Sequence, residues 1–177
     1  MTKQDLIHMT LTELENTVDI WIIALQKYDV SVLQTQPDSD NWSLGQVYLH
    51  ILNDTNFYME QAGICLSHKE NQSEKKTEFA ALLFSNNGFP DEKIEVDLLA
   101  NRTIPQPTNK ADLVEQMEQL KASLTSLWEK VSESSDYGKT KHPGLGYFNA
   151  REWLEFAEMH MRHHLRQKHR IEVAIET

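Results

Sequence analysis

The chain has 177 residues, of which 27 are acidic and 17 basic, so its formal net charge at pH 7 is −10. Because phosphate contacts dominate affinity for nucleic acids, this acidic balance argues against direct binding of DNA or RNA. The single cysteine, Cys65, excludes an internal disulfide, and no apolar run approaches the roughly 18 residues that a membrane span needs. We therefore expect one domain over residues 1–177, with neither nucleic acid nor membrane as a partner.

The first amphipathic segment runs from about Leu11 to Tyr28. Thr10 and Glu13 form a capping box that would begin it, because each side chain can bond a backbone N–H that the first turn leaves unpaired. We therefore predict a helix whose apolar face recurs at i, i+3, i+4 and i+7, with the residues Leu11, Leu14, Val18, Trp21, Ile22 and Leu25.

A second helix is predicted over about Leu44–Ser67. Ser43 and Gln46 form an S-x-x-Q capping box, which fixes where the first turn begins. The cap therefore also fixes the direction of His50, which lies two turns in at the edge of the apolar face. Asp54 follows one turn later on the same side of the helix.

A link of about forty residues, 68–108, follows the second helix. Loops of this length are usually functional or mobile. The apolar residues of this one predict that part of it packs back onto the helices: Phe79, Leu82, Leu83, Phe84 and Phe89. The alternating stretch Ile94–Leu98 can form a short extended piece. Because such a link can run the length of a bundle, the helices that it joins need not be antiparallel neighbours.

The third helix is predicted over about Lys110–Ser132, with Asn109 as its N-cap. The next connection, Ser134–Phe148, is expected to be a loop because it is rich in glycine and shows no alternating strand pattern. Its histidine, His142, is expected to be solvated or to cap a turn, although it could also approach a site at the start of the next helix.

The fourth helix is predicted over Ala150–Ile175, with a cap formed by Asn149 and Glu152. His160 and His164 lie four residues apart within its apolar stripe, so both rings leave the same face of the helix. Two nitrogens at that separation can bind one divalent ion at about 2.0–2.1 Å each. A hydrogen-bonded pair in the core, or a coincidence in a histidine-rich segment, would explain the same spacing.

The rest of the fourth helix is rich in histidine and basic residues. His163 points about 100° away from His164, toward the edge of the apolar stripe or to solvent. Gln167, three residues after His164, can orient its ring. We interpret the basic residues of the run Arg162–Arg170 as favourable charges near a helix C-terminus.

Two separated motifs resemble those of a known family. Asn41–Val47, followed by His50, resembles the W-S-x-G-Q-v-x-x-H opening of helix 2 in the DinB/YfiT-like superfamily. The closing segment of that family is similar to His142–Gly146, then Glu152–Leu154, then His160-x-x-x-His164-x-x-Gln167. The resemblance covers nearly the whole chain, with the two motifs in the expected order.

The resemblance implies an all-α four-helix bundle with a left-handed twist and a long crossover between helices 2 and 3. It also implies one metal ion bound by three histidines, and the matching positions are His50, His160 and His164. Three neutral imidazoles leave at least one coordination position for water or a substrate atom. Zn²⁺ is the expected ion, with Ni²⁺, Fe²⁺ or Mn²⁺ as alternatives, because metal availability as well as affinity decides.

Asp54 is the candidate catalytic residue, because it lies one turn after His50. A carboxylate there can accept a hydrogen bond from a ligand, or act as a base on a water bound to the metal. A hydrogen-bonded polar residue at the edge of the core would explain the same position.

Two classes of function remain open. The first is a metal-dependent enzyme, which the resemblance implies to be hydrolase-like or to transfer a small thiol such as bacillithiol or glutathione to an electrophile. The second is a non-catalytic bundle that binds a small molecule or a partner, with the metal structural or absent. An open coordination position beside a pocket favours the enzyme. A site closed by His163 or Asp54, without a cavity, favours the alternative.

The expected location is the cytoplasm, because Met1–Asp5 lacks the apolar region of a signal peptide and the chain has one cysteine. The expected partner is a small-molecule substrate. A homodimer is compatible with such a bundle, although no sequence pattern indicates it.

Overall fold

The computed structural model describes the backbone of residues 3–91 and 104–176, with side chains from residue 11 onward in those ranges. This part of the chain forms six helices and one two-stranded sheet. The helices are α1 (Lys3–Leu25), α2 (Val30–Gln34), α3 (Leu44–Ser67), α4 (Glu78–Ser85), α5 (Lys110–Glu133) and α6 (Ala150–Glu176). The strands are β1 (Lys139–His142) and β2 (Gly146–Asn149).

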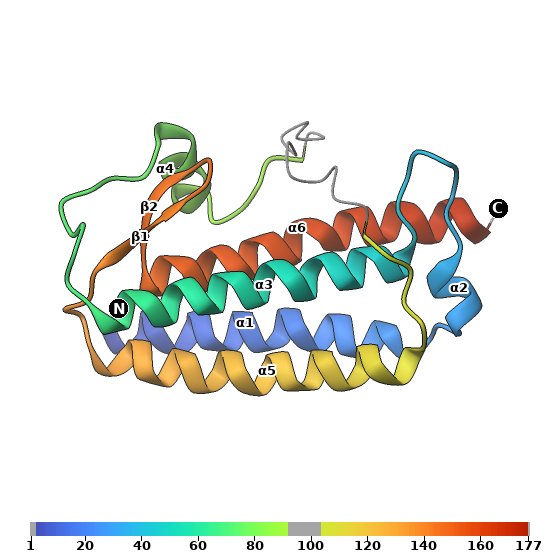
Figure 1. Ribbon diagram of the computed structural model, residues 1–177, viewed down its shortest axis with the longest axis horizontal. Coiled ribbons are helices and arrows are strands. Elements are labelled where there is room, and N and C mark those ends of the chain that lie inside the picture. Colours follow the sequence, from blue (N-terminus) through green and yellow to red (C-terminus); the bar gives the residue numbers. More distant parts are fainter. Residues whose placement is uncertain (1–2, 92–103, 177) are drawn as a thin grey trace.

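The four long helices, α1, α3, α5 and α6, lie side by side as a bundle (Figure 1). α3 packs against α6 and α5, and α1 packs against the same two helices. In Figure 1, α1 and α6 run in one direction along the bundle while α3 and α5 run in the other. Because α3 and α5 are parallel, the chain between them must return along the bundle, so the predicted long crossover and the all-α class are confirmed. The left-handed twist stays a prediction.

One apolar core lies between the four long helices. Its largest fully buried side chains include Trp21, Tyr48, Phe148 and Trp153. Polar atoms in this core are paired, as burial requires: the Tyr48 hydroxyl donates to Trp21 O over 2.8 Å, and Trp21 Nε1 donates to Met161 O over 3.3 Å. These two bonds tie α1 to α3 and α6. In the described ranges, no helix combines the length and apolar composition that crossing a bilayer would require.

The predicted start and end of the first helix are wrong. α1 begins at Lys3, seven residues before the proposed cap at Thr10 (10 − 3 = 7), because no glycine or proline interrupts the residues between them. It ends at Leu25, since the next three N–H groups bond carbonyl oxygens three residues back, as in a turn. The other long helices begin where their caps predict, and Asn109 caps α5 by accepting from the N–H of Asp112 over 2.8 Å.

The crossover packs back onto the bundle as predicted, through the short helix α4. Thr77 caps this helix by accepting from the N–H of Ala80 over 3.2 Å. Ala80 and Leu83 are buried, whereas Phe79 and Leu82 are 43% and 55% exposed. The predicted extended piece Ile94–Leu98 lies outside the described residues.

The crossover returns to the bundle at the first turn of α3. Gln46 donates to Ile104 O over 2.7 Å, and the Ser43 hydroxyl donates to Gln106 over 2.8 Å. A Cβ at position 45 would lie 2.4 Å from Pro107, so this close approach requires Gly45. The return of the chain therefore braces the turn that positions the rest of α3.

The connection between α5 and α6 is not the predicted loop. It contains an antiparallel hairpin of β1 and β2, in which Lys139 pairs with Asn149 and His142 with Gly146. Alternation did not reveal these strands because they are only four residues long, and their burial hardly alternates. Phe148 is the exception, since it is fully buried in the core, and so the hairpin is fixed to the start of α6.

Candidate metal centre

The three predicted ligands lie on α3 and α6, which pack against each other as antiparallel neighbours (Figure 1). The capping box of α3 is formed: Ser43 Oγ accepts from the N–H of Gln46 over 3.2 Å, and Gln46 Oε1 accepts from the N–H of Ser43 over 3.0 Å. α6 begins in the same way, with reciprocal bonds of 2.9 and 2.8 Å between Asn149 and Glu152. Both helices therefore start at fixed residues, which sets the directions of their histidines.

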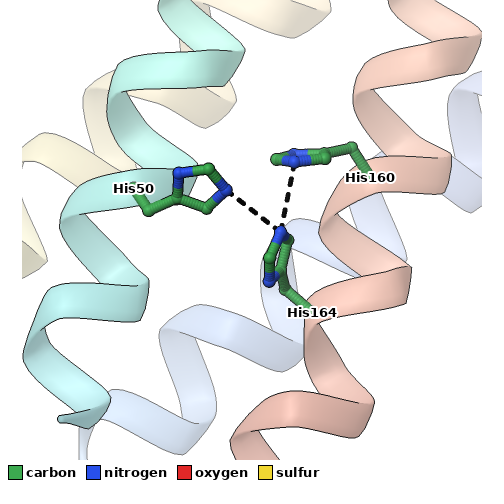
Figure 2. Close-up of side chains that lie close together, drawn as sticks. All are labelled: His50, His160 and His164. Carbon is green, nitrogen blue, oxygen red and sulfur yellow. Dashed lines mark hydrogen bonds between the residues drawn. The ribbon is translucent and has the colours of Figure 1, made fainter. Parts of the chain in front are cut away.

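The imidazole rings meet between the two helices, with their Nε2 atoms facing one another (Figure 2). His164 Nε2 lies 3.1 Å from His50 Nε2 and 3.1 Å from His160 Nε2. One nitrogen of each ring lies within 4.8 Å of the corresponding nitrogens of the other two. The fold therefore brings His50 into one cluster with two residues that follow it by more than a hundred positions.

The amide of Gln167 fixes the protonation of one ring. Its Oε1 lies 2.7 Å from His164 Nδ1, and because a carbonyl oxygen can only accept, Nδ1 carries the proton and donates it. The neutral ring then has its lone pair on Nε2, which faces the Nε2 atoms of His50 and His160. Metal-binding histidines are commonly oriented by such a bond. The expected contact between Gln167 and His164 is confirmed.

Burial keeps two of the rings in the neutral form. His160 and His164 are 8% and 9% exposed. Burial lowers the pKa of His164 to about 3, and the nearby His50 adds to this shift. Burial also lowers the pKa of His160 well below its ordinary value, with further contributions from His164 and His50. A neutral imidazole is the form that binds a metal ion.

The three nitrogens fit a single divalent ion. Two nitrogens bound to one ion at about 2.0–2.1 Å, at a tetrahedral angle, lie roughly 3.3 Å apart. The two distances of 3.1 Å at His164 are close to that separation. Hydrogen bonding alone does not satisfy the cluster, because the single lone pair of His164 Nε2 faces two ring nitrogens. Three imidazoles suit Zn²⁺, and also Ni²⁺ and Fe²⁺.

The carboxylate of Asp54 lies beside the cluster. Its Oδ2 is 3.6 Å from His50 Nε2 and 3.6 Å from His160 Nε2. The hydroxyl of Tyr58 donates to the same oxygen over 3.5 Å. The Asp54 side chain is 35% exposed, against 11% for each of the two histidine side chains, so the carboxylate is more open to solvent than either of these rings.

Aromatic rings pack against the histidines from three segments of the chain. Trp42, just before α3, has its ring centroid 5.1 Å from that of His50. Tyr58, within α3, lies 5.6 Å from His160, and Phe89, in the crossover, lies 6.4 Å from the same ring. Such walls exclude water and strengthen electrostatic interactions inside the site.

One ring nitrogen of the cluster is left without a hydrogen bond. His160 Nδ1 is buried and has no hydrogen-bond partner in the ranges that the structure describes. Ligand histidines usually donate their second N–H, as His164 does to Gln167. The ring of His160 is instead held by packing, with Phe156 stacked on it at 6.4 Å and Tyr58 edge-on.

His163 and His142 lie outside the cluster. The ring of His163 packs on Phe89, with centroids 5.0 Å apart, and its Nδ1 accepts from Arg166 over 2.9 Å. His142 belongs to β1, and its Nδ1 accepts from the N–H of Gly144 over 3.1 Å, so the expectation that it caps a turn is confirmed. Burial lowers the pKa of each of these histidines to about 4.

Two arginines of α6 donate hydrogen bonds to the crossover. These contacts were not predicted from the sequence. Arg166 donates to Phe89 O over 3.1 Å, and Arg162 donates to Asn87 O over 2.8 Å. Their interpretation as charges at a helix C-terminus is wrong, because α6 continues to Glu176 and its last turn holds no basic residue. Their partners lie far away in the sequence, so a local charge pattern carries no signal for them.

Comparison with known protein families identifies one family. The model of the DinB superfamily matches residues 13–167, a range that includes the three clustered histidines, Asp54 and Gln167. No curated protein matches the chain. Since the family model spans most of the sequence, the chain belongs to the DinB superfamily.

Proposed function

We propose that this protein is a metal-dependent enzyme in which His50, His160 and His164 bind one divalent ion and leave a coordination position for the reactants. The observation that supports this most directly is the cluster of three Nε2 atoms, with separations of 3.1 Å at His164. Three protein ligands with an open position are typical of catalytic metal sites, whereas structural sites are closed by four. Zn²⁺ is the ion that we expect, with Ni²⁺, Fe²⁺ or Mn²⁺ as alternatives.

When bound, such an ion polarises an electrophile and makes a coordinated water or thiol more acidic. The residue that we assign as the base is Asp54, because its Oδ2 lies 3.6 Å from two of the ligand nitrogens and its side chain is more exposed than those of His50 and His160. It would accept the proton of the attacking nucleophile. The hydroxyl of Tyr58, which donates to the same oxygen, orients the carboxylate.

The proposed substrate is a small molecule that reacts with a nucleophile at this site. The nucleophile is either water, which gives hydrolysis, or a low-molecular-weight thiol, which gives transfer of the thiol to an electrophile. Both reactions need the same first event, namely removal of a proton from the nucleophile. The distances of 3.6 Å from Asp54 Oδ2 to His50 and His160 Nε2 support the assignment of Asp54 as the acceptor of that proton. The apolar rings of Trp42 and Phe89 exclude water from the other sides of the histidines.

The test is an activity panel on protein purified without a histidine tag and saturated with Zn²⁺. The panel contains hydrolysable esters and amides, and electrophiles offered together with small thiols. Asp54→Asn should lower the rate by about 10²–10⁴-fold at saturating metal, because the carboxylate no longer accepts a proton. The matched control is Glu60→Gln, an exposed carboxylate of the same helix, which should keep the wild-type rate.

Two outcomes would count against the proposal. If Asp54→Asn and Glu60→Gln had equal rates in a reaction that the wild type catalyses, Asp54 would not be the base. If the zinc-saturated protein catalysed none of the reactions, we would reject the enzyme hypothesis. The alternative would then hold, in which the bundle binds a small molecule or a partner and catalyses no reaction.

A further inference from the structure

A cavity of ≈ 220 Å³ lies between α4, the chain that follows it, and α6. It is smaller than the roughly 300–1,000 Å³ of sites for drug-sized ligands, so it suits a molecule of about ten non-hydrogen atoms. Its lining is mixed. The polar side chains of Asn86, Asn87 and Arg162 line it together with the apolar side chains of Phe79, Leu82, Leu83, Phe89 and Pro90.

Arg162 supplies one polar group to this cavity that the protein does not use. Its Nε and Nη2 atoms donate to the buried carboxylate of Glu158 over 2.9 and 2.8 Å, and Nη2 also donates to Asn87 O. Its Nη1 has no hydrogen-bond partner among the described residues, and lies 3.2 Å from the position that a Cβ would take at Gly88, another lining residue. The Arg162 side chain is 42% exposed, so Nη1 lies at the open side of the cavity. A guanidinium N–H there can bind a hydrogen-bond acceptor, and binds a carboxylate most strongly.

Phe89 is shared by this cavity and the metal centre. Its ring lines the cavity, and its centroid lies 5.0 Å from that of His163 and 6.4 Å from that of His160. Arg166 holds the backbone of this residue by donating to Phe89 O over 3.1 Å. The wall between the two sites is therefore a single ring on a segment that is fixed to α6.

We propose that this cavity binds the apolar part of the substrate, and that the substrate carries a carboxylate which Arg162 Nη1 binds. The ligand class is thus a small amphipathic carboxylic acid. The proposal rests on the proposed function, because it places the substrate against the metal centre across Phe89. The neutralised pair of Glu158 and Arg162 leaves Nη1 as a donor without a large net charge, so the apolar contacts must supply part of the affinity.

The first experiment measures binding of two probes to the metal-free protein by calorimetry and by changes in protein NMR signals. Octanoate and 1-octanol share an apolar chain, but only octanoate carries a carboxylate. We expect octanoate to bind saturably at one site, at least about tenfold more tightly than 1-octanol, because it gains a charge-assisted hydrogen bond. Absence of saturable octanoate binding, or equal affinity for the two probes, would overturn the proposal.

Variants assign the binding to the cavity. Leu82→Glu places a carboxylate in the apolar lining and should weaken octanoate binding by about tenfold or more. The matched control, Ile23→Glu, changes an equally apolar and exposed residue on α1 and should bind octanoate as the wild type does. Equal effects of the two changes would mean that octanoate binds outside the cavity.

Arg162→Lys tests the carboxylate contact. It keeps a cation for Glu158 and removes Nη1, so it should reduce the preference for octanoate over 1-octanol. An unchanged preference would overturn the role of Arg162.

A second measurement tests whether the bound octanoate lies close to the metal centre. With Mn²⁺ in place of Zn²⁺, the paramagnetic ion should broaden the proton signals of bound octanoate, since this broadening requires proximity to the ion. Broadening in the wild type that is lost in Leu82→Glu would support the proposal. Octanoate that binds the Mn²⁺-loaded protein without broadening would contradict the placement. Failure of the proposed function is distinguishable, because it would appear as failure to bind metal while the metal-free protein still binds octanoate.

Discussion

The second nitrogen of each histidine ring decides how firmly a metal ligand is held. His164 donates its Nδ1–H to Gln167, which fixes both the tautomer and the ring plane. His160 has no such partner among the described residues, and relies on Phe156 and Tyr58 for its orientation. Of the two α6 ligands, only His164 is therefore oriented by a hydrogen bond to one side chain, Gln167, which a substitution can remove.

Replacement of Gln167 should weaken metal binding without removing it. Gln167→Ala leaves His164 free to rotate and to adopt the other tautomer, so the Kd for Zn²⁺ should rise by about 10–100-fold. Gln167→Glu keeps an acceptor at the same place and should restore most of the affinity. The control is Gln116→Ala, an exposed amide on α5. Calorimetric titration gives the four constants, and a Gln167→Ala protein with wild-type affinity would show that the bond plays no part.

His142 should make folding stability depend on pH. Its ring stacks on Trp153 at 5.5 Å and packs near Phe148, and burial lowers its pKa from 6.5 to about 4. The unfolded chain therefore binds a proton at a higher pH than the folded chain does. The stability that His142 contributes is complete above pH 6.5, and is lost as the pH falls from 6.5 to about 4.

The change that tests this is His142→Gln, which cannot gain a charge in that range. Urea unfolding at several pH values should show that the variant loses less free energy of unfolding between pH 6.5 and pH 4 than the wild type. The difference is at most roughly 3 kcal/mol, the equivalent of the pKa shift. Identical pH dependence of the two proteins would mean that the ring is protonated as easily in the fold as in the unfolded chain.

Among whole elements, the capped first turn of α3 sets the direction of the metal ligand that follows it. The first turn of α3 is fixed by a reciprocal cap between Ser43 and Gln46, and the returning crossover bonds to both residues. His50 follows two turns later, so any shift of the cap would displace it. The capping motif Ser43-x-x-Gln46, which is visible in the sequence, therefore helps to set the position of the metal ligand His50.

Removal of the Ser43 hydroxyl should therefore cost stability. Ser43→Ala removes the acceptor for the N–H of Gln46 and the donor to Gln106, and should lower the free energy of unfolding by about 1–2 kcal/mol. Ser39→Ala, at an exposed position in the preceding loop, should change it little. Urea denaturation at neutral pH measures both, and equal stability of the two variants would argue that the cap is dispensable.

Elements whose signals are local could be predicted from the sequence. The caps at Ser43, Asn109 and Asn149 begin α3, α5 and α6 where expected, because each depends on residues within one turn. The hairpin of β1 and β2 could not be predicted, since Phe148, its buried residue, packs on Phe84 of α4, which lies far away in the sequence. The bonds from Arg166 to the crossover were missed for the same reason.

For the molecule as a whole, the parallel directions of α3 and α5 determine which helices become neighbours. α3 and α6 are thereby placed in contact, and His50 meets His160 and His164 (Figures 1 and 2). The pair on α6 was evident from its spacing, but no helical periodicity states which helix will face it. The third ligand could be predicted only from the resemblance to a family, and the structure supplies the geometry that the resemblance leaves out.

The central claim is that three imidazoles from two helices bind one ion, and titration of Zn²⁺ into metal-free protein without a histidine tag tests it most directly. We predict one ion per chain for the wild type, and loss of binding in His50→Ala, His160→Ala and His164→Ala. His163→Ala should bind as the wild type does, because that ring lies outside the cluster. A wild-type protein that binds well below one ion per chain, or equal losses in all four variants, would contradict the account.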